Sequence, residues 1–407
     1  MSSGLREQLR AALRQPVRGE APVRSDNVTQ LADLSLMGGR WFESPQGPGY
    51  VVESRYEAGY EHGTVALHRA LDLDTVLLAP QCRDPRLAEC DASDFLYVDT
   101  ETTGMGGSGV LVFMAGVAYF EASTLHLDQY FLPSPDYEGG LLGELAERME
   151  RASALVSYNG KSFDVPVLET RYILSRMKPR WKELPHLDLL HPNRRLFKGM
   201  FESHRLARME QELLKFERED DAPSHEAPER YFKFQRTGDP THLLPVLRHN
   251  AWDVLSLVAL AAHLSHTCGV EGAPLQAARA AEYAGDHEPA ARLFATALES
   301  PGLGRTQRVD TLERLARCLG KLGRWEEAEE TWAMLAAEPR ARRLLPYIER
   351  AKIAEHRLKT PARALAVCEE ARGLVSRGLI RPGPEPGVLS VSALEGRISR
   401  LEQKLGR

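Results

Sequence analysis

The chain has 407 residues, 43% of them hydrophobic and 27% charged, which is the balance of a folded globular protein. This length exceeds the usual size of a single hydrophobic core, so two or more domains are expected. The net charge of −5 excludes a polycation that coats nucleic acid indiscriminately, so any contact with nucleic acid must come from local basic patches.

Cysteine usage and apolar runs indicate the compartment. The five cysteines are widely spread and form no Cys-x-x-Cys pair, which indicates reduced thiols and no structural zinc. The longest apolar run, residues 110–120, is far shorter than the roughly 20 residues that span a bilayer. Residues 5–15 lack the apolar core of a signal peptide. We therefore expect a cytoplasmic protein with no membrane partner.

The N-terminal part divides into two segments. Residues 1–37 combine a short helical pattern with a Pro/Arg segment and predict a flexible arm. Residues 38–93 contain short β-prone pieces at 50–56 and 75–78, separated by Gly and Pro. We expect this second segment to be an extension packed on the domain that follows.

The first acidic motif ends a predicted strand. Residues 95–104 read Phe-Leu-Tyr-Val-Asp-Thr-Glu-Thr-Thr-Gly. Side chains alternate along a strand, so Asp99 and Glu101 point to the same face and can share a divalent cation. Carboxylate oxygens suit Mg²⁺ or Mn²⁺. Taken alone, an Asp-x-Glu pair is more often a solvated face than a site.

Two further aspartates follow in patterned contexts. Residues 154–165 read Ala-Leu-Val-Ser-Tyr-Asn-Gly-Lys-Ser-Phe-Asp-Val, a strand followed by a turn and by Asp164 at the start of a helix. Residues 247–257 read Leu-Arg-His-Asn-Ala-Trp-Asp-Val-Leu-Ser-Leu on a predicted helix. At this spacing, His249 and Asp253 lie on one helical face.

Together these segments resemble the three motifs of the DnaQ-like, DEDD-type 3′→5′ exonucleases, which have a ribonuclease H-like fold. The resemblance implies two Mg²⁺ or Mn²⁺ ions, with Asp99 bridging both, Glu101 and Asp253 completing one site and Asp164 holding the other. Two such ions, about 3.5 to 4 Å apart, activate water and stabilise phosphoryl charge. The resemblance also places Thr102, Thr103 and Gly104 beside the terminal nucleotide. We expect Asn159 and Phe163 on the substrate side as well, and the alternatives are a turn residue for Asn159 and a core aromatic for Phe163.

His249 departs from the main pattern of that superfamily. Its two main versions have Tyr four residues, or His five residues, before the last Asp. A His at the four-residue spacing is similar to the YprB-type ribonuclease H-like branch. A histidine can accept the proton of water at neutral pH, so we expect His249 to be the general base. The alternative is a helix histidine that only hydrogen-bonds nearby backbone.

The remaining elements of residues 94–268 predict the fold. Strands are expected at 95–99, 110–120, 125–132, 154–158 and 186–190, and helices at 139–151, 164–177, 203–218 and 242–265. This order gives an α/β, ribonuclease H-like mixed sheet flanked by helices. Residues 219–240 are polar and proline-broken, and form either a loop that borders the active site or a plain surface connection.

Two basic stretches, residues 171–182 and 194–205, interleave cations with aromatic residues. Such a pattern can follow phosphates and stack bases, although a solvated face is the alternative. The second stretch follows Leu-Asp188-Leu-Leu, which resembles an element near the active site of the same superfamily. We therefore expect Arg194 and Arg195 to bind substrate, and Asp188 to be structural rather than a fifth metal ligand.

After residue 273 the composition shifts to Ala, Leu, Glu and Arg, and a repeat appears. Gly285, Ala290, Phe294 and Ala297 recur as Gly323, Ala328, Trp332 and Leu335, and more faintly as Lys359, Ala364, Cys368 and Ala371. The pattern resembles the tetratricopeptide helix pair, whose unit is roughly 34 residues. Residues 274–378 are thus expected to form an all-α, tetratricopeptide-like repeat domain. Residues 379–407 form a proline-rich linker and a helix that caps the array or, alternatively, dimerises.

The sequence thus predicts a metal-dependent 3′→5′ exonuclease that hydrolyses single-stranded DNA or RNA, with helical repeats available to a protein partner. The alternative is a catalytically weak or inactive nucleic-acid-binding scaffold whose repeats recruit a protein. The four carboxylates favour the enzyme, whereas the shifted histidine and the negative net charge favour the scaffold.

Overall fold

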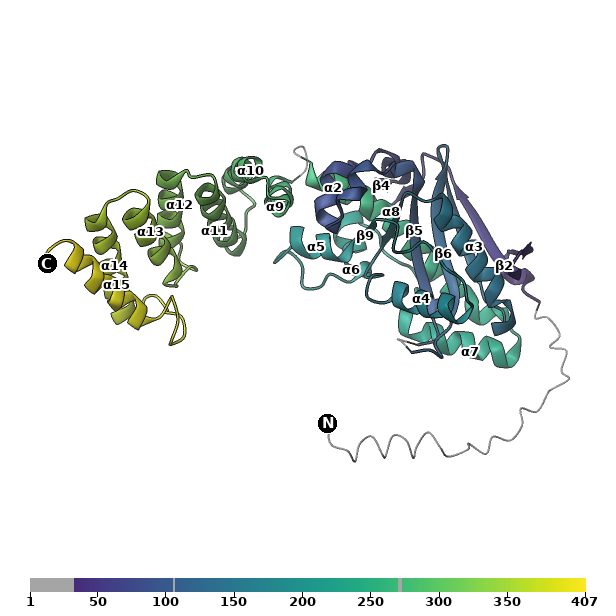
Figure 1. The fold of residues 1–407 in the computed structure, drawn as a ribbon. Helices are drawn as coiled ribbons and strands as arrows, with labels where there is room; N and C mark the ends of the chain where they lie inside the picture. Colours follow the sequence, from purple (N-terminus) through teal and green to yellow (C-terminus); the bar gives the residue numbers. More distant parts are fainter. Residues whose placement is uncertain (1–32, 105–106, 270–272) are drawn as a thin grey trace, which may run out of the picture.

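A computed structural model describes residues 33–104, 107–269 and 273–407, and Figure 1 shows two parts. One part is a sheet covered by helices, and the other is a row of helices that ends at the C-terminus. Residues 1–32, which contain most of the predicted arm, lie outside the described residues. Within the described part of the chain, no helix is long and apolar enough to cross a membrane.

A seven-stranded mixed sheet has the order β1-β2-β7-β6-β5-β8-β9. Its strands are β1 (Arg40–Ser44), β2 (Gly47–Tyr56), β5 (Phe95–Thr102), β6 (Val112–Glu121), β7 (Thr124–Phe131), β8 (Ala154–Ser157) and β9 (His186–Asp188). Neighbouring strands in the series β1, β2, β7, β6 and β5 pair antiparallel. Strand β8 pairs parallel to β5, and β9 pairs parallel to β8. A separate ribbon joins β3 (Glu61–His62) to β4 (Val65–Ala66).

The sheet separates two hydrophobic cores, because successive residues of β5 point to opposite faces. Phe95 and Tyr97 belong to the core under the long helix α8 (Leu244–Cys268). Leu96 and Val98 belong to the core under α3 (Glu138–Arg151), α4 (Asp164–Leu174) and α7 (Ala227–Thr237). Asp99 and Glu101 continue the alternation of Phe95 and Tyr97, so the motif carboxylates face α8.

The predicted strands and helices of residues 94–268 are confirmed, with shifts of a few residues at their ends. The largest shift concerns the helix expected at 203–218. It is a short helix, α6 (Leu206–Met209), that continues as one π turn over Glu210–Leu214. Two helices of residues 94–268 were not predicted: α5 (Leu190–Leu196), and α7, which lies inside the segment 219–240 that was expected to be a loop. Helix α2 (Thr75–Cys82) precedes this part of the chain.

The segment before residue 94 differs from expectation at three places. Residues 75–78 begin α2 rather than a strand, because the Asp74 side chain accepts a hydrogen bond from the Leu77 amide (2.9 Å) and caps a helix. Strands β1 and β2 belong to the main sheet, so residues 38–93 extend it rather than only packing on it. The last residues of the predicted arm are ordered: Leu34 and Met37 are buried, and the Tyr50 hydroxyl donates to the Leu34 carbonyl.

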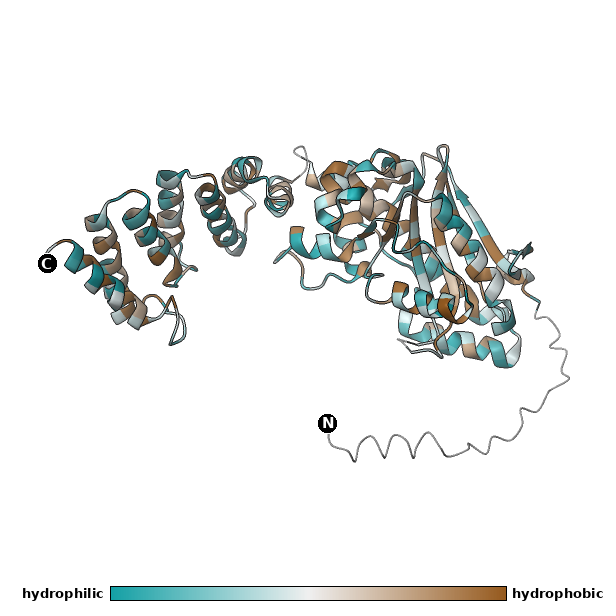
Figure 2. Cartoon of the chain, viewed as in Figure 1, coloured by the Kyte–Doolittle hydropathy of each residue, from teal (hydrophilic) through white to brown (hydrophobic). Residues whose placement is uncertain are grey.

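The C-terminal part is all-helical. Its helices are α9 (Pro274–Ala284), α10 (His287–Glu299), α11 (Arg305–Lys321), α12 (Trp325–Ala337), α13 (Leu345–His356), α14 (Pro361–Ser376) and α15 (Val391–Lys404). Each packs on the next along the row, and in Figure 2 hydrophobic and hydrophilic residues occupy different faces of these helices. At the other end of the row, α9 packs on α2, α5 and α8.

The repeated positions of the sequence are equivalent in this array. Gly285, Gly323 and Lys359 each have a positive φ, of 90°, 76° and 58°, where one helix of a pair turns into the next. The nine residues that recur after them are all buried: Ala290, Phe294, Ala297, Ala328, Trp332, Leu335, Ala364, Cys368 and Ala371. Leu394, Ile398 and Leu401 of α15 are buried in the core of the last pair.

Candidate active site

Strand β5 brings two carboxylates to an open stretch of the sheet. Its parallel partner β8 pairs with it only from Phe95 to Tyr97, whereas β6 continues alongside as far as Thr102. Asp99 and Glu101 therefore lie beyond the point where β8 leaves the sheet. The register shifts between Glu101 and Thr102, and this irregularity ends the strand at the site.

The turn after β8 supplies the third carboxylate. Asn159 has a φ of 66°, and the chain then enters α4 at Asp164. Asp164 Oδ1 accepts a hydrogen bond from the Thr100 hydroxyl at 2.5 Å, which links the helix start to β5. Asp188, 1% exposed, accepts hydrogen bonds from the backbone amides of Asn159, Lys161 and Leu190 (2.7, 3.2 and 3.2 Å). Asp188 therefore holds the turn in place, as the sequence predicted.

Helix α8 can approach the carboxylates because β6 has a glycine opposite Asp99. Gly116 pairs with Asp99, and a Cβ at Gly116 would lie 2.2 Å from Asn250 Oδ1. Asn250 Nδ2 donates to Asp99 Oδ2 at 2.8 Å, and its own oxygen accepts from Gln129 Nε2 at 2.9 Å. The amide of Asn250 is thus oriented by Gln129 and in turn orients Asp99.

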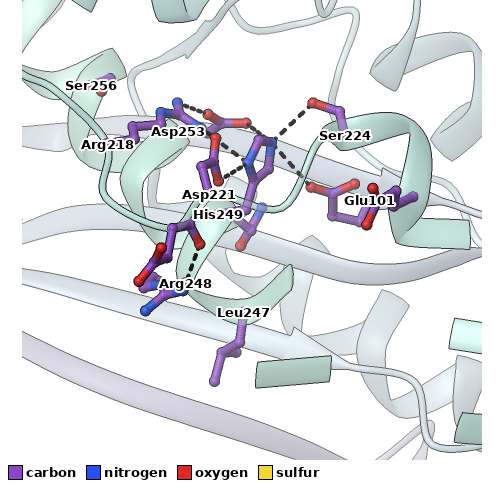
Figure 3. Close-up of polar contacts among 12 residues, drawn as sticks. Glu101, Arg218, Asp221, Ser224, Leu247, Arg248, His249, Asp253 and Ser256 are labelled. Carbon is purple, nitrogen blue, oxygen red and sulfur yellow. Dashed lines mark hydrogen bonds and ion pairs between the residues drawn. The ribbon is translucent and has the colours of Figure 1, made fainter. Parts of the chain in front are cut away.

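On α8, His249, directly before Asn250, and Asp253, about one turn after it, complete the cluster (Figure 3). His249 Nε2 lies 3.3 Å from Asp253 Oδ2 and 4.0 Å from Glu101 Oε1. Glu101, His249 and Asp253 each offer a ligand atom, and these atoms lie within 4.8 Å of one another. The i, i+4 spacing therefore places the histidine and the last aspartate on one face, toward β5.

The loop before α7 adds residues that the sequence analysis did not single out. Arg218, 7% exposed at its side chain, pairs with Glu210 (2.6 Å), with Asp221 (3.1 Å) and with Asp253. Asp221 Oδ1 lies 2.7 Å from His249 Nδ1 and Ser224 Oγ lies 3.0 Å from His249 Nε2 (Figure 3). The loop therefore borders the site, and the Asp221 contact favours the proton on Nδ1 of His249.

Burial and mutual repulsion perturb the acidic groups. Burial is the main cause that raises the pKa of Asp99, of Glu101 (to about 8) and of Asp164 (to about 6), and neighbouring carboxylates add to it for the first two. Burial opposes the charged form of His249, but the hydrogen bond and charge of Asp253, with Asp221, raise its pKa to about 9. With its carboxylate neighbours as they stand, His249 is protonated at neutral pH.

The donor set fits a divalent cation. Three aspartates and a glutamate converge with one imidazole, and oxygen ligands with at most one or two nitrogens suit Mg²⁺ and Mn²⁺. The pKa values of Asp99 and Glu101 are raised because ionising them places buried negative charges close together. A bound cation would offset this repulsion, which Arg218 and His249 offset only in part. Asp99, Glu101, Asp164 and Asp253 are the residues that could hold the cation.

A cavity of about 640 Å³ opens onto these carboxylates. Asp99, Glu101, Asp164 and Asp253 line it, together with other predicted residues: Thr102, Gly104, Asn159 and Phe163. The Phe163 ring is 45% exposed, so it is not a core aromatic. A second cavity of about 780 Å³ shares Asn159 and Asp253 with the first and is lined by His249 and Arg194.

Two predicted substrate residues are placed elsewhere. The Thr103 hydroxyl accepts a hydrogen bond from the Leu111 amide (2.9 Å), so it closes the turn between β5 and β6 instead of lining the cavity. Arg195 donates to the Gln81 carbonyl and stacks over the Tyr283 ring, 3.9 Å from its centroid. Consecutive helix residues point about 100° apart, so only Arg194 of the pair reaches the second cavity.

Fold and site together define a ribonuclease H-like domain with a cluster of acidic residues at the centre of its sheet. Residues 96–265 match the RNase_H superfamily. The chain is also 34% identical over 366 residues to Uncharacterized protein YprB of Bacillus subtilis (strain 168), covering 85% of this chain and 86% of that protein. It therefore belongs to the YprB family within the RNase H superfamily.

Proposed function

We propose that the protein is a metal-dependent 3′→5′ exonuclease of the DEDD type that degrades single-stranded nucleic acid. The superfamily and the acidic site support a nuclease, and one observation carries the finer proposal. Asp99, Glu101, Asp164 and Asp253, which come from three separate segments, line a single cavity that is open to solvent. Four carboxylates around one cavity are the arrangement that a two-metal phosphodiesterase needs.

In this proposal the four carboxylates hold two Mg²⁺ or Mn²⁺ ions. When bound, such ions activate a water molecule and neutralise charge on the phosphoryl oxygens. The protein supplies the positions of the ligands: Asn250 orients Asp99, and Thr100 orients Asp164. Ligand carboxylates that are hydrogen-bonded in this way lose less freedom when they bind a cation.

We propose that His249 accepts the proton of the attacking water at Nε2 once bound cations neutralise the carboxylate charge that otherwise raises its pKa. Asp221 holds Nδ1 at 2.7 Å, which fixes the orientation of the ring, and Nε2 faces Asp253 and Glu101. An imidazole whose far nitrogen is bound to a carboxylate keeps one tautomer and one direction. Asp221 is thus a positioning residue for His249.

The cavity walls suit an unpaired strand. The exposed Phe163 ring can stack on a base, and base–aromatic stacking contributes about 1–3 kcal/mol per base. Asn159, Thr102 and Gly104 lie beside it in the cavity lining. We assign these residues to the terminal nucleotides of the substrate, whether DNA or RNA.

We also propose that the helical array of residues 274–378 is tetratricopeptide-like and offers a surface to a protein partner. Three helix pairs with equivalent turn residues and equivalent buried residues support this assignment. The five cysteines are all unpaired thiols, which supports a reducing compartment such as the cytoplasm.

The test is cleavage of single-stranded DNA and RNA of the same sequence, labelled at the 5′ end, at the 3′ end, or circularised. The purified full chain is compared with its Asp164→Asn variant and with Asp136→Asn, which removes an exposed charge outside the cavity. We expect a descending ladder from the 5′-labelled strand, immediate release of the 3′ label, and an intact circle. Activity should require Mg²⁺ or Mn²⁺ and should be lost only in Asp164→Asn.

The outcomes separate the alternatives. Cleavage of the circle would replace the exonuclease with an endonuclease, and equal activity of Asp164→Asn would refute the proposed site. Binding without any cleavage would favour the alternative function, a nucleic-acid-binding scaffold. We favour the enzyme because all four carboxylates line one cavity.

A further inference from the structure

A cation-rich cavity lies where the helical array meets the RNase H-like domain. It has a volume of about 520 Å³, and five of its seven lining residues are basic: Arg194, Arg195, Lys198, Arg279 and Arg314. The other two are Glu282 and Tyr283. A local basic concentration in a chain of net charge −5 is the kind of patch that contacts phosphates. We call it the junction cavity.

The basic residues of the junction cavity divide into two groups. Arg195, Arg279 and Arg314 are already engaged. Arg195 donates to the Gln81 carbonyl, and Arg279 and Arg314 both pair with Asp310 (3.0 and 2.9 Å). Arg194 and Lys198 are exposed and have no ion pair among the described residues. The first group builds the wall, and the second group leaves positive charge available to a ligand.

The two sides of the junction cavity are fixed to each other. Helix α9 packs on α2, α5 and α8, and Gln81 Nε2 donates to the Ala280 carbonyl at 3.3 Å. The Tyr283 ring lies between two guanidinium groups, with Arg195 at 3.9 Å and Arg83 at 5.4 Å from its centroid. The wall of the cavity therefore holds its shape without a ligand, and binding would have to order only the exposed side chains of Arg194 and Lys198.

The junction cavity is linked to the cavity of the carboxylates through shared lining residues. The first cavity shares Asp253 and Asn159 with the second, and the second shares Arg194 with the junction cavity. Arg205 also lines the second cavity, so Arg194 is not its only cation. A strand whose end lies at Asp253 can thus follow positive charge to the helical array.

We propose that the junction cavity binds the phosphates of a nucleic-acid strand whose 3′ end lies at the catalytic carboxylates. The inference rests on the proposed exonuclease function. It assigns the helical array a part in holding the substrate, several nucleotides away from the reacting bond. Short substrates would not reach the junction cavity, whereas long strands would contact both the catalytic carboxylates and the junction cavity.

The test compares Lys198→Glu with Lys321→Glu in the full chain. Both lysines are exposed, and Lys321, at the end of α11, lines none of the three cavities. Binding of a trinucleotide and of a long labelled single strand is measured by fluorescence anisotropy in EDTA, over a salt series. Cleavage of both substrates is measured with Mg²⁺ or Mn²⁺.

We expect Lys198→Glu to weaken binding of the long strand about fivefold at about 0.1 M salt and to reduce the slope of log K against log salt by about 0.7, the effect of one phosphate contact. Cleavage of the trinucleotide should be unchanged, and Lys321→Glu should behave as the parent protein. If the two variants bind the long strand equally while the parent cleaves it, the inference is overturned and the proposed function stands.

Two other outcomes also count against the inference. If the parent protein neither binds nor cleaves either substrate, the proposed function fails first and the inference with it. If Lys198→Glu abolishes binding of poly-glutamate but leaves the long strand unaffected, the junction cavity takes an acidic protein instead.

Discussion

Without divalent cations, the RNase H-like domain should lose stability as the pH rises from about 5 to 8. Burial, and then the charges of Asp253 and Asp164, raise the pKa of Glu101 from 4.5 to about 8, against the effect of His249. Between these values the folded state keeps a proton that the unfolded chain releases, so stability present at low pH is lost as the pH rises through the folded pKa. His249, raised from 6.5 to about 9, changes stability in the same direction at higher pH.

The size of the effect follows from the linkage. At about 1.36 kcal/mol per pKa unit, the rise of the Glu101 pKa corresponds to roughly 4 to 5 kcal/mol between pH 5 and pH 8. For a domain of about 150–250 residues, 1 kcal/mol moves the melting temperature by about 2–4 °C. The expected fall is therefore on the order of 10 °C in EDTA.

Thermal unfolding of the full chain in EDTA, across this pH range, measures the effect. Mg²⁺ or Mn²⁺ should reverse most of the fall, because a bound cation stabilises the ionised carboxylates. Glu101→Gln should reduce the pH dependence in EDTA and leave the part that comes from Asp99, Asp164 and His249, whereas Glu43→Gln, at an exposed glutamate of β1, should leave it unchanged. A melting temperature that stays level from pH 5 to 8, or an unaltered slope in Glu101→Gln, would refute the reasoning.

Three further predictions concern neighbours of the carboxylates. Gly116→Ala should destabilise the domain by about 1–3 kcal/mol in denaturant unfolding, since its Cβ would meet Asn250 Oδ1 at 2.2 Å. Asp221→Asn should lower kcat about 10- to 100-fold, with KM changed little, because His249 loses the carboxylate that orients it. Phe163→Ala should raise KM for a single strand about 5- to 150-fold, the loss of one stacked base, with kcat on saturating substrate retained.

Each of these changes has a matched control. Gly109→Ala alters a glycine whose added Cβ meets nothing and whose φ, like that of Gly116, lies outside the left-handed region, so it lacks only the contact with Asn250. Asp136→Asn and Phe232→Ala remove an exposed aspartate and an exposed phenylalanine outside the cavity. If a control variant changes the measured stability, kcat or KM as much as the variant with which it is paired, the stated cause is wrong for that residue.

Much of the fold could be predicted from the sequence because local patterns and tertiary packing agree there. Alternation along residues 95–102 places apolar side chains in both cores, and the i, i+4 spacing of His249 and Asp253 holds on α8. The short piece at 75–78 was mispredicted as β-prone, because its residue types fit a strand while the Asp74 cap selects a helix. Here the helix cap at Asp74 goes with a helix, although the residue types at 75–78 favour a strand.

The parts of the site that the sequence did not reveal depend on contacts between distant segments. Arg218 ends a predicted helix and Asp221 lies in a polar run without periodicity, and only folding brings them to His249. Gly116 looks like an interruption of an apolar strand, whereas it allows the approach of Asn250. Arg194 and Arg195 look alike in the sequence, but the helix turns them toward different cavities.

The positions of the four carboxylates along the sequence also decide when a chain under synthesis can form its site. Asp99 lies on the central strand, but Asp253 lies on α8, which is among the last elements of the domain to leave the ribosome. At about 5–20 residues per second, Asp253 is synthesised roughly 10 to 30 s after Asp99. During that interval β5 has neither the helix that covers it nor the fourth carboxylate. An interrupted chain that stops before α8 therefore has no complete site.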